Sequence, residues 1–452
     1  MSETLMISVS GMRGHVGKDL TPELVARHAA ALGSWVTSRG GRSVVIGRDA
    51  RTSGPMFTLA AAAGFQSVGI DVIDVGVVPT PTVQMAVEYH RAGAGLIITA
   101  SHNPIEWNAL KFVGPDGIFL DAEAGAQVRQ LAEAGPPRSG WDRIGGLTQD
   151  HTAIERHLDA ILELPEIDVD VINKAGFHVA LDAVRGAGGP TMLRLFDRLG
   201  VKVSGIHLDA DGRFPHEPEP VPANLGDLAE LVRERGADVG MAVDPDVDRL
   251  ALVDETGTPI GEDYTLALAV AAVLARVPAG AQSVVVANLS TSLVVEEAAT
   301  RRGARFVRAP VGEANVARVI VAEGAVIGGE GNGGVILPAL HVGRDAPLAA
   351  ALILQYLATA GRSLSALVAG SPRYAIVKAK MDRGGDLEAQ YSALAAIFPD
   401  AESDRRDGLR LSWPDRWLHV RPSGTEPIVR LIAEAPTEDE AAALVARARS
   451  AR

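Results

Sequence analysis

The chain has 452 residues, which predicts about three domains, and its 47% of hydrophobic residues is ordinary for a globular protein with large buried cores. It has no cysteine, which excludes a disulfide scaffold, cysteine-ligated zinc or iron–sulfur centres, and thiol catalysis. The net charge of −13 disfavours nucleic acid and anionic membranes as partners, so an anionic substrate would need local clusters of Arg and Lys.

Neither a signal peptide nor a membrane span is evident. The N-terminus has an early Glu3 and no long apolar stretch. The longest apolar run, 266–275, is shorter than the roughly 20 residues that a spanning helix needs, and reads as a buried helix. We therefore expect a cytoplasmic protein.

Short runs rich in β-branched residues alternate with longer helical patterns along most of the chain. The first helix is well marked, because Thr21 can cap it, Pro22 suits its first turn and Gly40 follows its end. The other elements expected in this first unit are a strand at 43–47, a helix near 55–67, a strand at 71–76, a helix near 81–90 and a strand at 95–100.

Two further units repeat this alternation. The second has expected strands at 178–184, 201–207 and 238–244, with helices near 189–199 and 225–235. The third has expected strands at 283–288, 304–309 and 325–329, with helices between them. The rhythm predicts βαβ units and largely parallel sheets.

The last segment, 371–452, has a different pattern. RYAIVKAKM, LRLSW, WLHVRPS and IVRLIAEA are expected strands, accompanied by helices near 385–396 and 437–450. The predicted fold class is α/β, with three related α/β domains of mixed, largely parallel sheets and a C-terminal α+β domain around a central cleft. The predicted domains are 1–149, 150–257, 258–370 and 371–452.

In each α/β unit, a buried strand runs into a polar or glycine-rich loop. The three loops are TASHNP at 99–104, DPDVDR at 244–249 and GEGNGG at 329–334. Because ligands of open parallel sheets bind outside the carboxyl ends of the strands, we expect these loops to meet around one cleft.

The loop DPDVDR carries three alternating carboxylates, Asp244, Asp246 and Asp248. Their mutual repulsion calls for a cation, and oxygen-only ligands suit Mg²⁺ better than zinc. One alternative is a solvated acidic turn. Another is an EF-hand loop, which needs a glycine at its sixth position, where Arg249 stands. The pattern favours a magnesium site.

The loop TASHNP places Ser101 just beyond an apolar strand, with His102 beside it and Lys111 ten residues on. A serine held in this way is a nucleophile if a neighbouring group accepts its proton. Taken alone, the motif favours the alternative of a polar turn in which Ser101 or Asn103 caps the backbone.

The segment RPSGTEP combines a guanidinium, two hydroxyls and a glycine that exposes backbone N–H groups. This set suits a phosphate, and a simple β-turn between two strands is an equally good interpretation of the segment alone. The loop GEGNGG matches the dinucleotide-binding glycine pattern by letter, but Pro338 follows it instead of a helix, so we reject that interpretation.

Further basic residues lie in polar loops of the sequence. They are Arg13, Arg48, Arg51 and Arg344. Singly, each suits a surface position or a salt bridge. Together they would offset the acidic net charge around an anionic substrate.

These motifs, in this order, resemble the α-D-phosphohexomutase superfamily, which includes phosphoglucomutase, phosphomannomutase and phosphoglucosamine mutase. The resemblance runs from SGMRG near the start to RPSGTEP near the end and includes GRDARTSG, VPTPT and FPHEPEPVPANL. It implies three related α/β domains followed by a C-terminal α+β domain, which agrees with the organisation expected from the strand and helix patterns.

The resemblance also implies which residues carry out catalysis and what each of them does. Ser101 would bear the phosphoryl group, and an oxygen of phospho-Ser101 would share one Mg²⁺ ion with Asp244, Asp246 and Asp248. Lys111 would be the general base. The other residues matching family positions near the phosphoserine are Arg13, His102 and Arg249.

Substrate contacts follow in the same way. Glu330 and Asn332 would contact sugar hydroxyls. The phosphate that is not transferred would be held by Arg421, Ser423, Gly424 and Thr425. Two positions depart from the common bacterial motifs, since Ser10 replaces an aspartate and the sugar loop has Asn332 and Gly334 in place of serine and histidine.

The implied activity is reversible phosphoryl transfer between C6 and C1 of a hexose phosphate, through a hexose 1,6-bisphosphate that is also the activator. Gly424 favours phosphoglucosamine mutase over phosphoglucomutase or phosphomannomutase. A Mg²⁺-dependent sugar phosphatase and a non-catalytic sugar-phosphate-binding protein are the more distant alternatives. A homodimer is left open.

Overall fold

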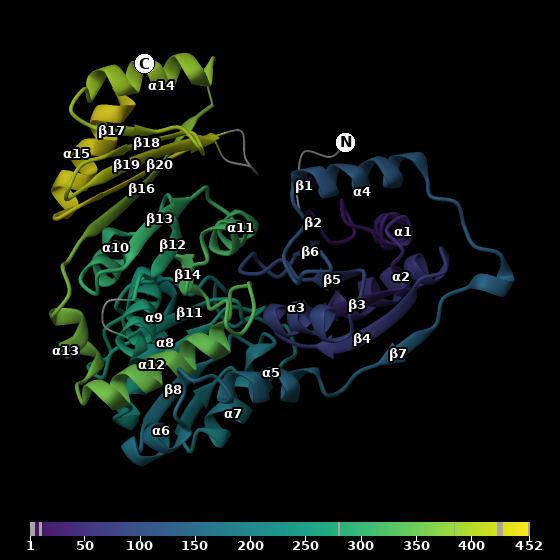
Figure 1. The fold of residues 1–452 in the computed structure, drawn as a ribbon, viewed down its shortest axis with the longest axis horizontal. Coiled ribbons are helices and arrows are strands. Elements are labelled where there is room, and N and C mark those ends of the chain that lie inside the picture. Colours follow the sequence, from purple (N-terminus) through teal and green to yellow (C-terminus); the bar gives the residue numbers. More distant parts are fainter. Residues whose placement is uncertain (1–4, 9–10, 279–280, 384, 423–427, 451–452) are drawn as a thin grey trace.

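The computed structural model describes residues 5–8, 11–278, 281–383, 385–422 and 428–450, which form four β-sheets with helices around them (Figure 1). The first sheet contains β1 (Met6–Ser8), β2 (Gly11–His15), β3 (Ser43–Arg48), β4 (Asp71–Val77), β5 (Ala94–Ile98), β6 (Trp107–Val113) and β7 (Leu147–Gln149). Their spatial order is β1-β2-β6-β5-β3-β4-β7. β3 pairs in parallel with β4 and β5, whereas β6 pairs antiparallel with β5 and β2, so the sheet is mixed.

The helices of this unit that pack on the sheet or on each other are α1 (Pro22–Thr37), α2 (Gly54–Gln66), α3 (Thr80–Tyr89) and α4 (Ala122–Ala134). The 3₁₀ turn η1 (Trp141–Arg143) lies in the exposed segment after α4. α1 begins as the sequence predicts, because the Thr21 hydroxyl accepts the Leu24 N–H at 3.4 Å. α2 lies against α1 at Gly64, where a Cβ would fall 2.3 Å from the Ala26 carbonyl oxygen.

The second sheet contains β8 (His178–Asp182), β9 (Lys202–Ile206), β10 (Val239–Val243) and β11 (Leu250–Val253), in the order β11-β10-β8-β9. β8 is parallel to β9 and β10, and β11 is antiparallel to β10. The helices around it are α5 (Ala153–Leu162), α6 (Val169–Ala175), α7 (Gly188–Arg198), η2 (Pro222–Asn224) and α8 (Gly226–Arg235).

The third sheet contains β12 (Val284–Asn288), β13 (Arg305–Ala309), β14 (Ile327–Glu330) and β15 (Gly334–Ile336), in the order β13-β12-β14-β15. Its helices are α9 (Asp263–Arg276), α10 (Leu293–Thr300), α11 (Glu313–Glu323), α12 (Ala346–Ala360) and α13 (Leu364–Ala369). One continuous hydrophobic core joins this unit to the second, since it includes Met241 from β10, Leu266 from α9 and Leu352 from α12. The two units therefore pack as one body.

The last unit is an antiparallel sheet with its own core, in the upper left of Figure 1. Its strands are β16 (Ala375–Asp382), β17 (Glu402–Asp404), β18 (Leu409–Ser412), β19 (Trp417–Pro422) and β20 (Ile428–Ala435), in the order β16-β20-β19-β18-β17. Two helices, α14 (Leu387–Ile397) and α15 (Glu438–Arg449), contribute Leu394 and Leu444 to that core. The observed architecture confirms the predicted fold class.

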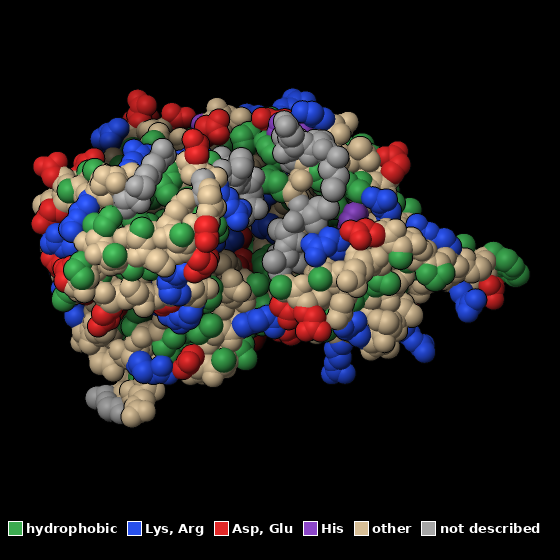
Figure 2. Space-filling model, turned by 90° about the horizontal axis from the view of Figure 1, so that it is seen from above, with side chains coloured by type: hydrophobic (Ala, Val, Ile, Leu, Met, Phe, Trp, Pro, Cys, Tyr) green, Lys and Arg blue, Asp and Glu red, His purple; other side chains and the backbone are tan. Residues whose placement is uncertain are grey.

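One segment extends away from the rest of the molecule. It joins α4 to β7 and forms the narrow projection at the right of Figures 1 and 2, where Trp141 is 90% exposed. Among the described helices, none combines the length and the apolar character needed to cross a membrane.

Candidate active site

Ser101 lies just beyond the carboxyl end of β5, and its backbone has the left-handed φ of +50° that serine rarely adopts. Two short contacts hold the turn. The Ser101 N–H donates to the Thr99 hydroxyl at 2.9 Å, and that hydroxyl donates to the Asp49 carboxylate at 2.6 Å. Strain of this kind persists only where the surroundings enforce it. The Ser101 side chain points toward Asp244.

Arg51 provides most of that enforcement. Its guanidinium is fully buried and pairs with Asp49 at 3.1 Å. It also donates to four backbone carbonyls of the serine loop, those of Ser101 (2.6 Å), Asn103 (2.6 Å), Pro104 (2.7 Å) and Trp107 (2.9 Å). The Arg51 guanidinium is therefore engaged inside the protein, where it braces the serine loop.

Replacing Arg51 with Lys is expected to loosen the serine loop. A lysine keeps the charge but lacks the planar guanidinium with its several N–H donors. Buried carbonyls therefore lose their donors, and the free energy of unfolding falls by about 3 kcal/mol. We expect a lower melting temperature and faster amide hydrogen exchange over residues 99–107. The half-buried Arg48 donates to one nearby carbonyl at 3.4 Å, so Arg48→Lys is the control. Equal behaviour of the two variants would contradict the bracing role of Arg51.

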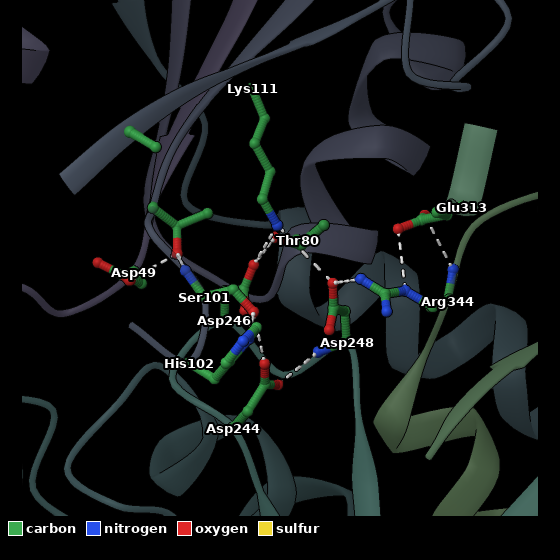
Figure 3. A network of polar contacts seen from close by, with 12 residues as sticks. Asp49, Thr80, Ser101, His102, Lys111, Asp244, Asp246, Asp248, Glu313 and Arg344 are labelled. Carbon is green, nitrogen blue, oxygen red and sulfur yellow. Dashed lines mark hydrogen bonds and ion pairs between the residues drawn. The ribbon is translucent and has the colours of Figure 1, made fainter. Parts of the chain in front are cut away.

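Asp244, Asp246 and Asp248 follow β10 and face Ser101 across the gap between the first two sheets (Figure 3). All three are buried, and the Ser101 hydroxyl donates to Asp244 Oδ2 at 2.9 Å. Thr80 at the start of α3 donates to Asp246 twice, from its N–H to the backbone carbonyl at 2.8 Å and from its hydroxyl to Oδ2 at 2.9 Å. The structure therefore brings the serine loop and the acidic loop together, as predicted.

The acidic loop has the donor set of a divalent-cation site. Its carboxylate oxygens lie within 4.8 Å of one another. In the described chain, the buried Oδ1 atoms of Asp246 and Asp248 accept no hydrogen bond. Buried carboxylate oxygens normally have a partner, so these atoms are available to a metal ion. Oxygen donors of this kind fit Mg²⁺.

Two cations balance the carboxylates, the partly buried Lys111 and the buried Arg344. Lys111 on β6 lies 2.7 Å from Asp246 and 3.7 Å from Asp248, and Arg344 lies 2.6 Å from Asp248. Burial opposes the charged form of Lys111, but Asp246 and Asp248 raise its pKa above the usual value. Lys111 is therefore an ammonium group in this arrangement.

The carboxylates themselves differ in their affinity for a proton. Burial, with repulsion from Asp248 and Asp246, raises the pKa of Asp244 well above its usual value. Burial acts in the same direction on Asp246, but the adjacent Lys111 holds the pKa of Asp246 far below its usual value. A metal ion that binds here competes with a proton on Asp244, so its affinity should rise with pH.

Arg13, His102 and Arg249 line the same cavity of about 420 Å³ as Ser101 and Lys111. Burial first, and then the charges of Arg249 and Arg13, lower the pKa of His102 to about 2, so its ring is neutral. Arg13 donates to Asn103 at 2.6 Å. Arg13 and Arg249 give the cavity a positive wall beside the serine.

Glu219, which no sequence motif singles out, lies at this wall. It is 3.8 Å from both His102 and Arg249. Its position within FPHEPEPVPANL is the one feature of the sequence that points to Glu219. Tertiary packing, which local sequence patterns do not predict, brings this loop residue to the cavity.

The glycine-rich loop 329–334 joins the acidic loop through Arg344. Glu330 is buried at the end of β14 and accepts from Asn288 at 2.8 Å, from the Gly312 N–H at 3.0 Å and from Arg344 at 3.1 Å. Arg344 also pairs with Glu313 at 3.0 Å and lies 3.4 Å from Asn332. The third predicted loop therefore meets the acidic loop, with Arg344 as an internal connector, and the acidic loop in turn contacts the serine loop.

The predicted phosphate-binding segment is described only in part. Arg421 on β19 pairs with Asp407 at 3.0 and 3.3 Å, and Asp407 also accepts the Val311 N–H at 3.1 Å. This contact ties the last unit to the segment before α11. The other residues predicted for this segment, Ser423, Gly424 and Thr425, lie outside the described residues, as does Ser10.

Family models match almost the whole chain. They describe the phosphoglucomutase/phosphomannomutase α/β/α domain I over residues 5–138, domain II over 155–257, domain III over 261–374 and the C-terminal domain over 376–451.

Individual relatives agree with this result. A phosphoglucomutase/phosphomannomutase of Thermococcus kodakarensis is 38% identical, over 95% of this chain and 94% of its own length. A probable phosphoglucosamine mutase of Methanopyrus kandleri is 37% identical, over 96% and 94%. The crystal structure of a phosphoglucomutase/phosphomannomutase family protein from Burkholderia thailandensis has a TM-score of 0.88 at 28% identity, covering 100% of this chain and 97% of that one. The chain therefore belongs to the phosphoglucomutase/phosphomannomutase family of phosphohexomutases, which are isomerases that move a phosphoryl group within a hexose phosphate.

Proposed function

We propose that this phosphohexomutase interconverts the 6- and 1-phosphates of glucosamine through phospho-Ser101 and a hexose 1,6-bisphosphate. The observation that carries the mechanism is the Ser101 hydroxyl, which lies 2.9 Å from the first of three buried aspartates. The choice of glucosamine rests on Gly424 and on relatives named probable phosphoglucosamine mutase. The Thermococcus relative supports phosphoglucomutase or phosphomannomutase as the second candidate.

In this mechanism, Asp244, Asp246 and Asp248 would hold one Mg²⁺, with an oxygen of phospho-Ser101 as a further ligand. The bound ion would neutralise phosphate charge. Arg13 and Arg249 line the cavity beside Ser101, and their positive charge favours a transferring phosphoryl group.

Transfer exchanges one P–O bond for another. A sugar hydroxyl attacks phosphorus and loses its proton to a base, while the bond from phosphorus to Ser101 Oγ breaks. The sugar bisphosphate then turns, and its other phosphate returns to Ser101. Lys111 lines the cavity and is the proposed base. It can accept a proton only when its contacts with Asp246 and Asp248 weaken, because those contacts favour the ammonium form.

Each of the four segments, 1–149, 150–257, 258–370 and 371–452, supplies one part of this site. Arg421, with Ser423, Gly424 and Thr425, would hold the phosphate that is not transferred, and Glu330 and Asn332 would bind sugar hydroxyls. Because either end of the bisphosphate must bind, these contacts should accept two orientations of the sugar.

Replacing Glu330 with Gln is expected to slow turnover of every hexose phosphate by about 10- to 100-fold, since a charged acceptor for a shared hydroxyl is lost. Glucosamine differs from glucose and mannose only at C2, so wild type should turn over more than one of them. Coupled mutase assays across the three sugar phosphates test both statements.

The matched control is Glu296→Gln, because Glu296 pairs with Arg308 in the same unit and is partly exposed. A wild type restricted to one sugar, or a Glu330→Gln defect confined to one sugar, would mean that this loop recognises C2. The same assay addresses the phosphatase alternative, which predicts phosphate release without stimulation by a hexose 1,6-bisphosphate.

A further inference from the structure

A second group of side chains that could bind a metal ion lies in the second unit, away from the acidic loop 244–249. Asp182 ends β8, and His207 and His216 come from the segment that follows β9. Their potential ligand atoms lie within 4.8 Å of one another. His207 Nδ1 is 3.1 Å from Asp182 Oδ1, and His216 Nε2 is 2.9 Å from Asp182 Oδ2.

The hydrogen bond at the far side of His216 determines its tautomer. His216 Nδ1 lies 2.9 Å from the Glu217 carbonyl oxygen, which can only accept, so Nδ1 carries a hydrogen. In a neutral ring, Nε2 then presents a lone pair to the Asp182 carboxylate. That contact is repulsive unless a cation lies between the two groups. Histidines that bind metals commonly donate their other N–H to a backbone carbonyl in this way.

His207 and Asp182 are also held in position by the backbone. His207 has a left-handed φ of +54°, and its carbonyl accepts the Arg185 N–H at 2.8 Å. Asp182 is buried, and its Oδ1 accepts the Val184 N–H at 2.9 Å. The two histidine side chains are about one-fifth exposed, so water has access to the site.

We propose that Asp182, His207 and His216 form a second metal site, selective for Zn²⁺ or a similar transition metal, with water as a fourth ligand. Two imidazoles and one carboxylate suit zinc, whereas Mg²⁺ prefers an all-oxygen set. In a tetrahedral zinc site, ligand atoms lie about 3.3 Å apart. The two carboxylate–histidine distances, 3.1 and 2.9 Å, are already near that spacing.

The site would fasten a segment that reaches the catalytic cavity. Phe214, two residues before His216, lies with its ring 4.9 Å from the Arg51 guanidinium. Glu219, three residues after His216, lies 3.8 Å from both His102 and Arg249. The loop that follows Asp182 at the end of β8 contacts the acidic loop, because the Ala187 N–H donates to the Pro245 carbonyl at 2.8 Å. A metal ion at Asp182 would therefore join the segment 207–219 to the loop after β8, and both of these contact the catalytic cavity or the acidic loop.

The test uses the full chain, stripped with a chelator and then kept in excess Mg²⁺ to fill the aspartate site. Wild type should retain one Zn²⁺ per chain through desalting and should melt at a higher temperature with Zn²⁺ than without it. His207→Ala and His216→Ala should each weaken Zn²⁺ binding by about 10-fold or more. His178→Ala is the matched control, because His178 lies on the same sheet and contacts Ser204 instead.

A measurement on wild type alone does not depend on the folding of the variants. The X-ray absorption spectrum of bound Zn²⁺ should contain two imidazole ligands. An all-oxygen spectrum would place the ion among the aspartates and overturn the proposal. Failure of wild type to retain Zn²⁺ would overturn it too, since a proton on His216 would then be the cation facing Asp182. Undiminished binding by both folded histidine variants would have the same consequence.

Discussion

Ser101→Ala is expected to reduce mutase activity by about 10⁴-fold or more, because the variant has no oxygen to carry the phosphoryl group. The fold should survive. The Ser101 N–H still reaches Thr99, and Arg51 still holds the carbonyls of the loop. The loss should therefore appear in kcat with little change in the melting temperature, and should persist at any concentration of hexose 1,6-bisphosphate.

Ser67→Ala is the control for this experiment. Ser67 caps the end of α2 and donates to the Gly64 carbonyl, so its loss leaves the cavity intact. Wild-type activity in Ser101→Ala would contradict the phosphoserine mechanism and would require another nucleophile.

Asp246→Asn is expected to slow transfer by about 10²-fold or more and to raise the Mg²⁺ concentration needed for half-maximal activity. The substitution removes a ligand charge from a buried site in which Asp246 also balances Lys111. Activity measured as a function of Mg²⁺ separates the two effects, because a weaker site is partly rescued by more metal.

The control for this experiment is Asp254→Asn. Asp254 is a buried carboxylate just after β11 whose partners are Thr256 and Thr258 in its own turn. An unchanged Mg²⁺ dependence in Asp246→Asn would contradict the metal-ligand role.

Local signals predicted much of the fold. The capping of α1 by Thr21 and the apolar runs at β3, β5, β10 and β12 are properties of a few adjacent residues, and they lead to the observed elements. The rule that ligands bind beyond the carboxyl ends of parallel strands also predicts that Ser101 and Asp244 lie near one another.

The elements and contacts that were missed depend on tertiary pairing. The sequence pattern does not predict β6, yet the antiparallel pairing of β6 with β2 and β5 sets Lys111 opposite Gly11 and Ile97 and brings it to the aspartates. The ten-residue spacing from Ser101 to Lys111 does not by itself predict that the chain turns back as β6 and places Lys111 beside the aspartates. Arg51 is similar, because a charged residue in a polar loop reads as exposed unless the four carbonyls that enclose it are known.

No sequence pattern predicts the connection between loop 329–334 and the acidic loop 244–249. Arg344 meets Asp248, Glu313 and Glu330, residues that are 14 to 96 positions away along the chain. Its position in a polar loop of the sequence predicts only a general offset to negative charge. Its observed role is narrower, since it links a proposed metal ligand to a proposed sugar ligand within one buried network.

The most direct test of the account is to locate the phosphate on the protein. Wild type incubated with a hexose 1,6-bisphosphate should gain one phosphoryl group by intact mass, and phosphopeptide mapping should assign it to Ser101. The same treatment of Ser101→Ala should leave the protein unmodified. Phosphate found only at other residues, or active wild-type enzyme that never carries phosphate on Ser101, would contradict the central claim.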